Sequence, residues 1–308
     1  MTTSYWLNTA THFLESKSIT TARLDCLVLL EDTLHMDRAQ LLAEPTTEMK
    51  DAQVAHLQKL LSRRSKHEPL AYIRGHSEFY GRKFVVNAAV LEPRPESETM
   101  VDLLKGLPLF SSSKIGSECA TSPEAPVFGP NSTNNGSGAE GASEGSKAAQ
   151  TVKIADIGAG SGALGITAAI ELEGASVDLF EIDPAAIKVA QFNVDRLTTG
   201  LRVIESDLLA SASMDYDVLL CNLPYVPDDY GINKAASFEP AIALFGGPDG
   251  LDLYRKLFEQ LATVQKRPLF ILTESLPEQH AALAALAADN SYELQKTDDF
   301  IQLFAHKA

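Results

Sequence analysis

Short apolar segments alternate with longer amphipathic ones from Thr151 onward, and this alternation constrains the fold more than any other feature of the chain. The apolar segments, rich in Val, Ile, Leu and Phe, are "VKIADIG", "SVDLFEI", "RVIES", "YDVLLCN" and "RPLFILTES". The segments between them, such as "PAAIKVAQFNVDRL" and "DLYRKLFEQLATV", have the apolar spacing of helices. Strands that alternate with helices are typical of a parallel sheet with helices on both faces. We therefore predict a doubly wound α/β domain over residues 151–308.

The two ends of the chain have different patterns. After the last predicted helix, "SYELQKT" and "FIQLFAHKA" lie close enough in sequence to pair as an antiparallel hairpin. In residues 1–75, apolar residues recur mostly at spacings of three and four, which predicts a small bundle of helices. Residues 76–110 contain the aromatic and β-branched stretch "FYGRKFVVNAAVLEPRPESE", which predicts a hairpin and a linker between the two domains.

Residues 111–150 are dominated by Ser, Gly, Ala, Asn and Pro, with scarcely any large apolar side chain. Such a segment cannot bury enough apolar surface to offset the entropy lost on ordering. We predict a disordered insertion here and assign it no function.

Composition excludes several classes of protein. The chain has 308 residues, with 26 Lys and Arg against 41 Asp and Glu, a net charge of −15. This acidity opposes contact with a nucleic-acid backbone, where Lys and Arg supply most of the affinity, so we expect no direct nucleic-acid partner. The longest apolar runs fall far short of the roughly 20 residues of a membrane helix, and no basic region precedes an apolar core at the N-terminus. We expect a cytoplasmic protein without a membrane partner.

Cysteine and histidine give no sign of a metal centre. The three cysteines are widely spaced, which predicts neither a disulfide framework nor a zinc cluster. The seven histidines show no metal-ligand spacing. We therefore expect no metal site.

The first predicted strand of the α/β domain runs into a glycine-rich turn, "DIGAGSGALGI". Gly158, Gly160 and Gly162 permit a tight turn that brings the backbone close to a ligand at the N-terminus of the next helix. About twenty residues further on, Glu181 ends the second strand, where its carboxylate can accept hydrogen bonds from two ribose hydroxyls. An NAD site and an S-adenosylmethionine (SAM) site both fit. A turn that only packs helix against strand is the alternative.

Polar residues also follow the third and fourth strands. Asp207, in "ESDLL", can accept a hydrogen bond from an adenine amino group, although a solvated loop carboxylate is the commoner outcome. In "CNLPY", the side-chain carbonyl of Asn222 and the backbone carbonyl of Leu223 can together hold both hydrogens of one NH2 group. Pro224 restricts the direction of the Leu223 carbonyl, and Tyr225 can cover a planar group. A proline turn with a core tyrosine is the alternative.

With these motifs in order, the chain resembles the peptide chain release factor N(5)-glutamine methyltransferases over nearly its whole length except residues 111–150. The blocks that carry the resemblance are "ARLDCLVLL", "EPLAYIRGHSEFYGRKFVV", "LEPRPESE", "DIGAGSGALGI", "NLPY" and "FEPAIALFGGPDGL". The resemblance implies a Rossmann-like, SAM-dependent methyltransferase fold, with a seven-stranded sheet whose C-terminal strand is reversed. It also implies a small N-terminal helical domain that recognises the substrate.

The resemblance further implies roles for individual residues. The implied SAM-binding set is Gly158, Ala159, Gly160, Ser161, Gly162, Glu181, Asp207, Leu208 and Asn222. The implied catalytic set is Asn222, Leu223, Pro224 and Tyr225. The glycine turn would lie under the methionine part of SAM, Glu181 would bind the ribose, and Asp207 and Leu208 would flank the adenine. The implied substrate is the glutamine of a Gly-Gly-Gln loop in release factors, methylated on its side-chain amide nitrogen. We expect a monomer whose partners are release factors, acting in translation termination.

The chain departs from the family pattern at one catalytic position and in the insertion after Phe110, which either lies near the cofactor entrance or hangs free. The family usually has Asn-Pro-Pro-Tyr, whereas Leu223 here replaces the first proline and some rigidity is lost. Asn-Leu-Pro-Tyr also resembles the motif of ribosomal RNA adenine dimethyltransferases, so an adenine amino-group methyltransferase acting on RNA or DNA is the alternative function. A protein that binds SAM or a partner without catalysis is a third hypothesis. The segment "PRPESE", with Arg94 and Glu96, would lie near the cofactor pocket or serve only as a hinge.

Overall fold

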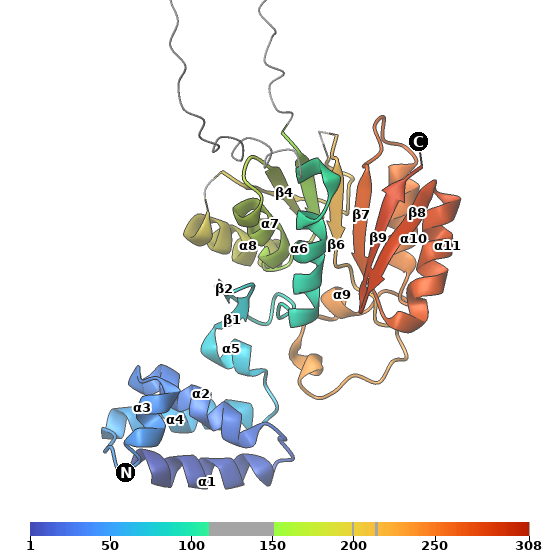
Figure 1. Ribbon diagram of the computed structural model, residues 1–308. Helices are drawn as coiled ribbons and strands as arrows, with labels where there is room; N and C mark the ends of the chain where they lie inside the picture. The colour runs from blue at the N-terminus through green and yellow to red at the C-terminus, as the bar shows by residue number, and fades with distance from the viewer. Residues whose placement is uncertain (111–150, 199, 213–214, 308) are drawn as a thin grey trace, which may run out of the picture.

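A bundle of five helices comes first in the computed structural model, which describes residues 1–110, 151–198, 200–212 and 215–307 (Figure 1). The helices are α1 (Thr3–Glu15), α2 (Ala22–Leu34), α3 (Arg38–Ala43), α4 (Asp51–Arg64) and α5 (Leu70–Arg74). Their apolar faces enclose one core that includes Trp6, Leu14, Leu29 and Leu57. The predicted N-terminal helices are confirmed. The insertion predicted at residues 111–150 lies outside the described residues, and the limits of the predicted domains stay predictions.

Seven strands form the larger sheet of the described residues, in the order β5-β4-β3-β6-β7-β9-β8. They are β3 (Lys153–Ile157), β4 (Ser176–Glu181), β5 (Arg202–Glu205), β6 (Val218–Cys221), β7 (Phe270–Glu274), β8 (Tyr292–Asp298) and β9 (Ile301–His306). The pairs among β3 to β7 are parallel, whereas β9 is antiparallel to both of its neighbours. The predicted α/β fold, with its terminal hairpin and reversed C-terminal strand, is confirmed.

Helices cover both faces of this sheet because successive side chains of a strand point to opposite sides. Ile154 on β3 packs in the core of the face covered by α6 and α7, and its neighbour Ala155 packs in the core under α10 and α11. Figure 1 shows α6 lying across the front of the sheet. The covering helices are α6 (Glu98–Lys105), α7 (Ala163–Glu171), α8 (Pro184–Leu197), α10 (Asp252–Leu261) and α11 (His280–Asp289). Shorter helices are the 3-10 helices η1 (Pro95–Ser97), η3 (Ala236–Phe238) and η4 (Pro277–Gln279) and the α-helix α9 (Ala241–Leu244).

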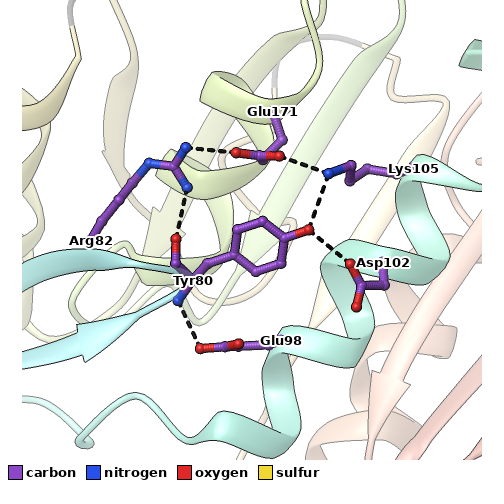
Figure 2. A network of polar contacts seen from close by, with 6 residues as sticks. All are labelled: Tyr80, Arg82, Glu98, Asp102, Lys105 and Glu171. Atoms are coloured by element: carbon purple, nitrogen blue, oxygen red, sulfur yellow. Dashed lines mark hydrogen bonds and ion pairs between the residues drawn. The ribbon is translucent and has the colours of Figure 1, made fainter.

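The predicted hairpin consists of β1 (His76–Phe79) and β2 (Arg82–Val85), and it lies against α6, α7 and α8. Its turn residues, Tyr80 and Gly81, have φ angles of +50° and +72°, as a two-residue hairpin turn requires. We call the polar network around this turn the hairpin clamp. Its members are Tyr80, Arg82, Glu98, Asp102, Lys105 and Glu171 (Figure 2).

Within the hairpin clamp, Tyr80 is bonded at both ends. Its N–H donates to Glu98 Oε1 at 2.7 Å, and its hydroxyl donates to Asp102 Oδ1 at 2.8 Å (Figure 2). Lys105 Nζ donates to the same hydroxyl at 3.1 Å and to the Glu171 carboxylate at 2.7 Å. Glu98, Asp102 and Lys105 are spaced by four and three residues, which places them on one face of α6. The clamp therefore fixes the hairpin turn against α6.

The two ends of α6 lie at opposite ends of the sheet's parallel strands. Ser97, just before α6, donates a hydrogen bond to Glu274 at the carboxyl end of β7. Phe110, beyond the other end of α6, packs against the same apolar core as Val152, which directly precedes β3. The chain therefore enters and leaves residues 111–150 at the edge where β3 begins. Within the described residues, no helix is long and apolar enough to cross a membrane.

Candidate functional site

A pocket of about 270 Å³ opens at the carboxyl edge of the sheet, where β3, β4 and β6 end. This is the edge at which ligands of open α/β sheets bind. It brings together most of the residues predicted from the sequence: Gly158, Ala159, Gly160, Ser161, Glu181, Asp207, Leu208, Asn222, Leu223 and Pro224. Gly162 and Tyr225 of the predicted sets lie outside the pocket lining.

The glycine turn combines two different requirements. The φ angles of Gly158, Gly160 and Gly162 are +72°, +55° and +79°, in the region that favours glycine. A Cβ on Gly162 would lie 2.9 Å from Ile166 Cδ1 and 3.0 Å from Leu179 Cδ2, so this glycine serves helix packing. A Cβ on Gly160 would have no described heavy atom within 4 Å. Gly160 lines the pocket, so that open space is available to a ligand.

Glu181, at the end of β4, is held by backbone donors. Its Oε1 accepts hydrogen bonds from the N–H groups of Ile182 at 2.8 Å and Asp183 at 3.0 Å. Its Oε2 accepts one from the N–H of Gly160 at 2.8 Å. A carboxylate has about four acceptor positions, so one position on Oε2 remains for a ligand hydroxyl.

Asp207 and Leu208 follow β5 and form another wall. The carboxylate of Asp207 pairs with Lys256 Nζ, and both side chains are exposed. Leu208 has a φ of +53°, and its carbonyl accepts a hydrogen bond from Ser206 Oγ at 2.8 Å. Such backbone strain persists only where the surrounding structure holds it, and it is common at ligand sites.

The tetrapeptide after β6 is anchored from behind. Asn222 Nδ2 donates to Ser97 Oγ and to Glu274 Oε2, each at 3.0 Å. The Tyr225 hydroxyl donates to Glu274 Oε1 at 3.1 Å, and burial raises the pKa of this phenol. No described residue donates a hydrogen bond to Asn222 Oδ1. Tyr225 therefore binds the same Glu274 carboxylate as Asn222 and does not line the pocket.

Asp156 is a pocket residue to which the sequence analysis gave no role. It lies on β3, is 1% exposed, and accepts a hydrogen bond from the N–H of Gly165 at 2.8 Å. Burial raises the pKa of its carboxyl group to about 7. An acidic residue inside an apolar strand was the available sequence signal.

Arg94 closes a further side of the pocket. It lines the pocket, and its Nη2 lies 2.7 Å from both carboxylate oxygens of Glu239. The Glu239 side chain is 1% exposed, and burial raises the pKa of its carboxyl group. The segment with Arg94 is therefore tied to the chain that follows β6. Glu96 of the same segment does not line the pocket.

Other contributors were missed because they lie far away in the sequence. Asn193 on α8 donates to the carbonyl of Ser161 in the glycine turn at 2.9 Å. Ser97 and Glu274 contact Asn222 from positions 125 and 52 residues away along the chain. The only sequence signal for Glu274 was its place at the end of a predicted strand, where the carboxyl ends of parallel strands meet.

Comparisons with known proteins agree on the type of domain. A family model described as "PrmC N-terminal domain" matches residues 5–75, and one described as "Methyltransferase small domain" matches residues 137–236. The hMettl16 catalytic domain, solved in complex with a MAT2A 3′UTR hairpin, is similar in fold with a TM-score of 0.50. It is 11% identical, and the match covers 85% of this chain and 82% of that one.

Curated relatives match over most of the chain. A "Release factor glutamine methyltransferase" of Koribacter versatilis is 30% identical over 268 residues, which cover 85% of this chain and 81% of the relative. One of Bacillus subtilis is 31% identical over 266 residues, which cover 84% and 80%. A "Bifunctional methyltransferase" of Rickettsia felis is 30% identical over 94% of this chain, but the match spans only 54% of that longer relative.

Proposed function

The chain belongs to the release factor glutamine methyltransferase family, and from this membership we propose that it methylates the side-chain amide nitrogen of a release factor glutamine. The methyl donor proposed is SAM, and the glutamine is that of the Gly-Gly-Gln loop. The observation that carries the proposal is the arrangement of Asn222. Its NH2 end is bound to Ser97 and Glu274, which leaves its carbonyl oxygen to accept a hydrogen bond from a ligand amide.

The pocket has the chemistry that SAM requires. The space beside Gly160 admits a ligand close to the backbone. The remaining acceptor position of Glu181 suits a ribose hydroxyl, and the Asp207 carboxylate suits an amino group on a purine. Apolar side chains of Leu208 and Leu223 suit the faces of a planar base. When bound, SAM supplies a methyl group already activated by the adjacent sulfonium.

The protein's part in the reaction follows from the weakness of an amide nitrogen as a nucleophile. Its lone pair is delocalised into the carbonyl group. Asn222 Oδ1 and the carbonyl oxygen of Leu223 accept the two N–H hydrogens, which orients the nitrogen and stabilises the positive charge that develops on it. Positioning of this kind can contribute about 7 to 11 kcal/mol in favourable cases. No strong base needs to act before the attack, because the nitrogen would release one N–H proton to water only after the methyl group has moved to it from the sulfonium.

The test is transfer of labelled methyl from SAM to three substrates in parallel. The substrates are a release factor, the same factor with the Gly-Gly-Gln glutamine replaced by Ala, and total RNA. Label on the release factor alone, lost in the substituted factor, is the expected result. Label on RNA alone would instead assign the enzyme to the adenine class and overturn the proposal.

A variant separates catalysis from cofactor binding. Asn222→Ala removes one of the two amide acceptors, and we expect methyl transfer to fall by about 100-fold or more because charge stabilisation is lost. The dissociation constant for SAM should rise far less than methyl transfer falls, because Glu181 and the glycine turn, which contact most of the cofactor, are untouched. Turnover equal to that of the unmodified enzyme contradicts the proposed role of Asn222.

A further inference from the structure

Glu274 lies directly behind Asn222 and outside the pocket lining. The parallel pairing of β6 with β7 sets Cys221 opposite Thr273. The following residues, Asn222 and Glu274, are therefore neighbours at the carboxyl edge. Glu274 is only 1% exposed. It can therefore affect the site only through neighbouring side chains and not by contacting a ligand.

In every hydrogen bond around Glu274, the carboxylate is the acceptor. An ionised carboxylate only accepts, so the hydroxyl of Ser97 donates to Oε2 at 2.5 Å and the hydroxyl of Tyr225 donates to Oε1 at 3.1 Å. Ser97 has a single hydroxyl hydrogen, and that hydrogen is used in the hydrogen bond to Glu274. Ser97 Oγ can therefore only accept from Asn222, as it does from Nδ2 at 3.0 Å.

This chain of acceptors distinguishes the two ends of the Asn222 side chain. The NH2 end meets two acceptors, Glu274 Oε2 and Ser97 Oγ, each at 3.0 Å. A half-turn of the amide would bring Oδ1 against a carboxylate oxygen and an oxygen lone pair, with no hydrogen between them. It would also present an NH2 group to the substrate, donor against donor. The carboxylate of Glu274 therefore sets which end of Asn222 faces the pocket.

We propose that Glu274, with Ser97 as its relay, is a positioning residue that keeps Asn222 oriented as a hydrogen-bond acceptor toward the substrate amide. This inference rests on the proposed function, because it concerns the same NH2 group. It adds two residues, neither of them in the predicted catalytic set, that determine whether Asn222 can bind a substrate NH2 group at all.

The cost of the arrangement also points to function. No Lys or Arg among the described residues forms an ion pair with Glu274, and its carboxylate is held by neutral donors only. Burial raises the pKa of this carboxyl group, while the hydroxyls of Ser97 and Tyr225 lower it. A buried charge without a charged partner usually weakens a fold. Packing alone would be served better by an apolar residue of similar length.

The variants for the test are Glu274→Met, Glu274→Gln and, as a matched control, Thr273→Val. Methionine keeps the length of the side chain and removes both carboxylate oxygens, leaving only a weakly accepting sulfur. Glutamine keeps one oxygen for Ser97 and Asn222 and can donate its NH2 to the Tyr225 hydroxyl. Thr273 is the buried neighbour on β7, its side chain points to the opposite face, and its Oγ1 has no partner among the described residues.

Each full-length enzyme is assayed for kcat on a release factor and for SAM affinity by calorimetry. We expect Glu274→Met to lower kcat by at least about tenfold with SAM affinity within about twofold, because the acceptor end of Asn222 is no longer held toward the substrate. Glu274→Gln should keep kcat within about fivefold, and Thr273→Val should behave as the unmodified enzyme. An unchanged kcat in Glu274→Met, or a loss of SAM affinity as large as the loss of kcat, overturns the inference.

A second measurement needs neither a substrate nor a folded variant. In the unmodified enzyme, hydrogen exchange of the Asn222 side-chain NH2, assigned by NMR, should be much slower than that of Asn233, which is exposed. Equal exchange rates would show that Asn222 is not held, and would overturn the inference. If the unmodified enzyme transfers no methyl to a release factor but the Asn222 amide is protected, the proposed function fails and the orientation of Asn222 by Glu274 stands.

Discussion

Replacing Asn193 by Ala tests how the hairpin and the glycine turn are held to the sheet. Asn193 lies on α8 with an exposed fraction of 0%. Its Nδ2 donates to the carbonyls of Val85 at 3.0 Å and Ser161 at 2.9 Å, and its Oδ1 accepts from the N–H of Val85 at 2.8 Å. One side chain therefore joins the last residue of β2 to a residue of the pocket wall.

The expected loss can be worked out from these three bonds. Each contributes about 0.5 to 1.5 kcal/mol, so their loss costs about 1.5 to 4.5 kcal/mol. A group left without a partner where water cannot reach it costs about 1 to 3 kcal/mol instead. This applies to the carbonyl of the buried Ser161, whereas Val85 is half-buried and water can reach its two groups. We expect the free energy of unfolding to fall by about 3 to 5 kcal/mol, a large part of the about 5 to 15 kcal/mol of an ordinary domain.

The assay is urea unfolding of the unmodified protein, Asn193→Ala and Gln191→Ala. Gln191 lies on the exposed side of the same helix, and its loss should change the free energy of unfolding by less than about 0.5 kcal/mol. Asn193→Ala should also weaken SAM binding, because Ser161 is released. A loss of less than about 1 kcal/mol in Asn193→Ala would refute the reasoning, since even the weakest value for three bonds exceeds it.

Three further changes have expected outcomes. Gly250→Ala should lower kcat by at least about tenfold, because φ is +77° and the new Cβ would lie 2.0 Å from the carbonyl oxygen of Tyr225; a normal kcat contradicts this. Asp156→Asn should raise the melting temperature relative to the unmodified protein as pH rises from about 4 to about 7. The reason is that burial raises the pKa of Asp156 to about 7, so between these pH values the unfolded state has lost its proton while the folded state keeps it, and unfolding is increasingly favoured. A constant difference across this range contradicts it. Arg94→Ala leaves the buried Glu239 carboxylate unpaired and should cost about 1 to 3 kcal/mol, reduced because Arg94 is 38% exposed. Limited proteolysis should then cut residues 226–246 faster, and an unchanged pattern contradicts the coupling.

The α/β architecture was accessible from sequence because its signals are local. The segment "VKIADIG" is apolar on both faces, which is typical of a strand buried between two helical layers, and it became β3. The last hairpin likewise follows from two short segments that lie close in sequence. The turn at Tyr80 and Gly81 requires positive φ at both positions. Glycine adopts this conformation readily, whereas the preference of tyrosine does not predict it.

The site was predictable only where a residue's own chemistry identifies it. Gly160 and Glu181 follow strands in a recognisable order, and both line the pocket. Gly162 belongs to the same motif, but its lack of a side chain serves the packing of Ile166. The partners of Asn222 could not be deduced, because periodicity indicates which face of a strand is buried and not which side chains meet across strands. Their hydrogen bonds depend on the completed sheet.

The described residues on either side of residues 111–150 lie far from the pocket. The flanking residues, Phe110 and Val152, pack at the edge where β3 begins, while the glycine turn and Asn222 lie where strands end. The whole length of the strands separates the two. A fluorophore or affinity tag attached beside Phe110 or Val152 is therefore expected to leave methyl transfer unchanged.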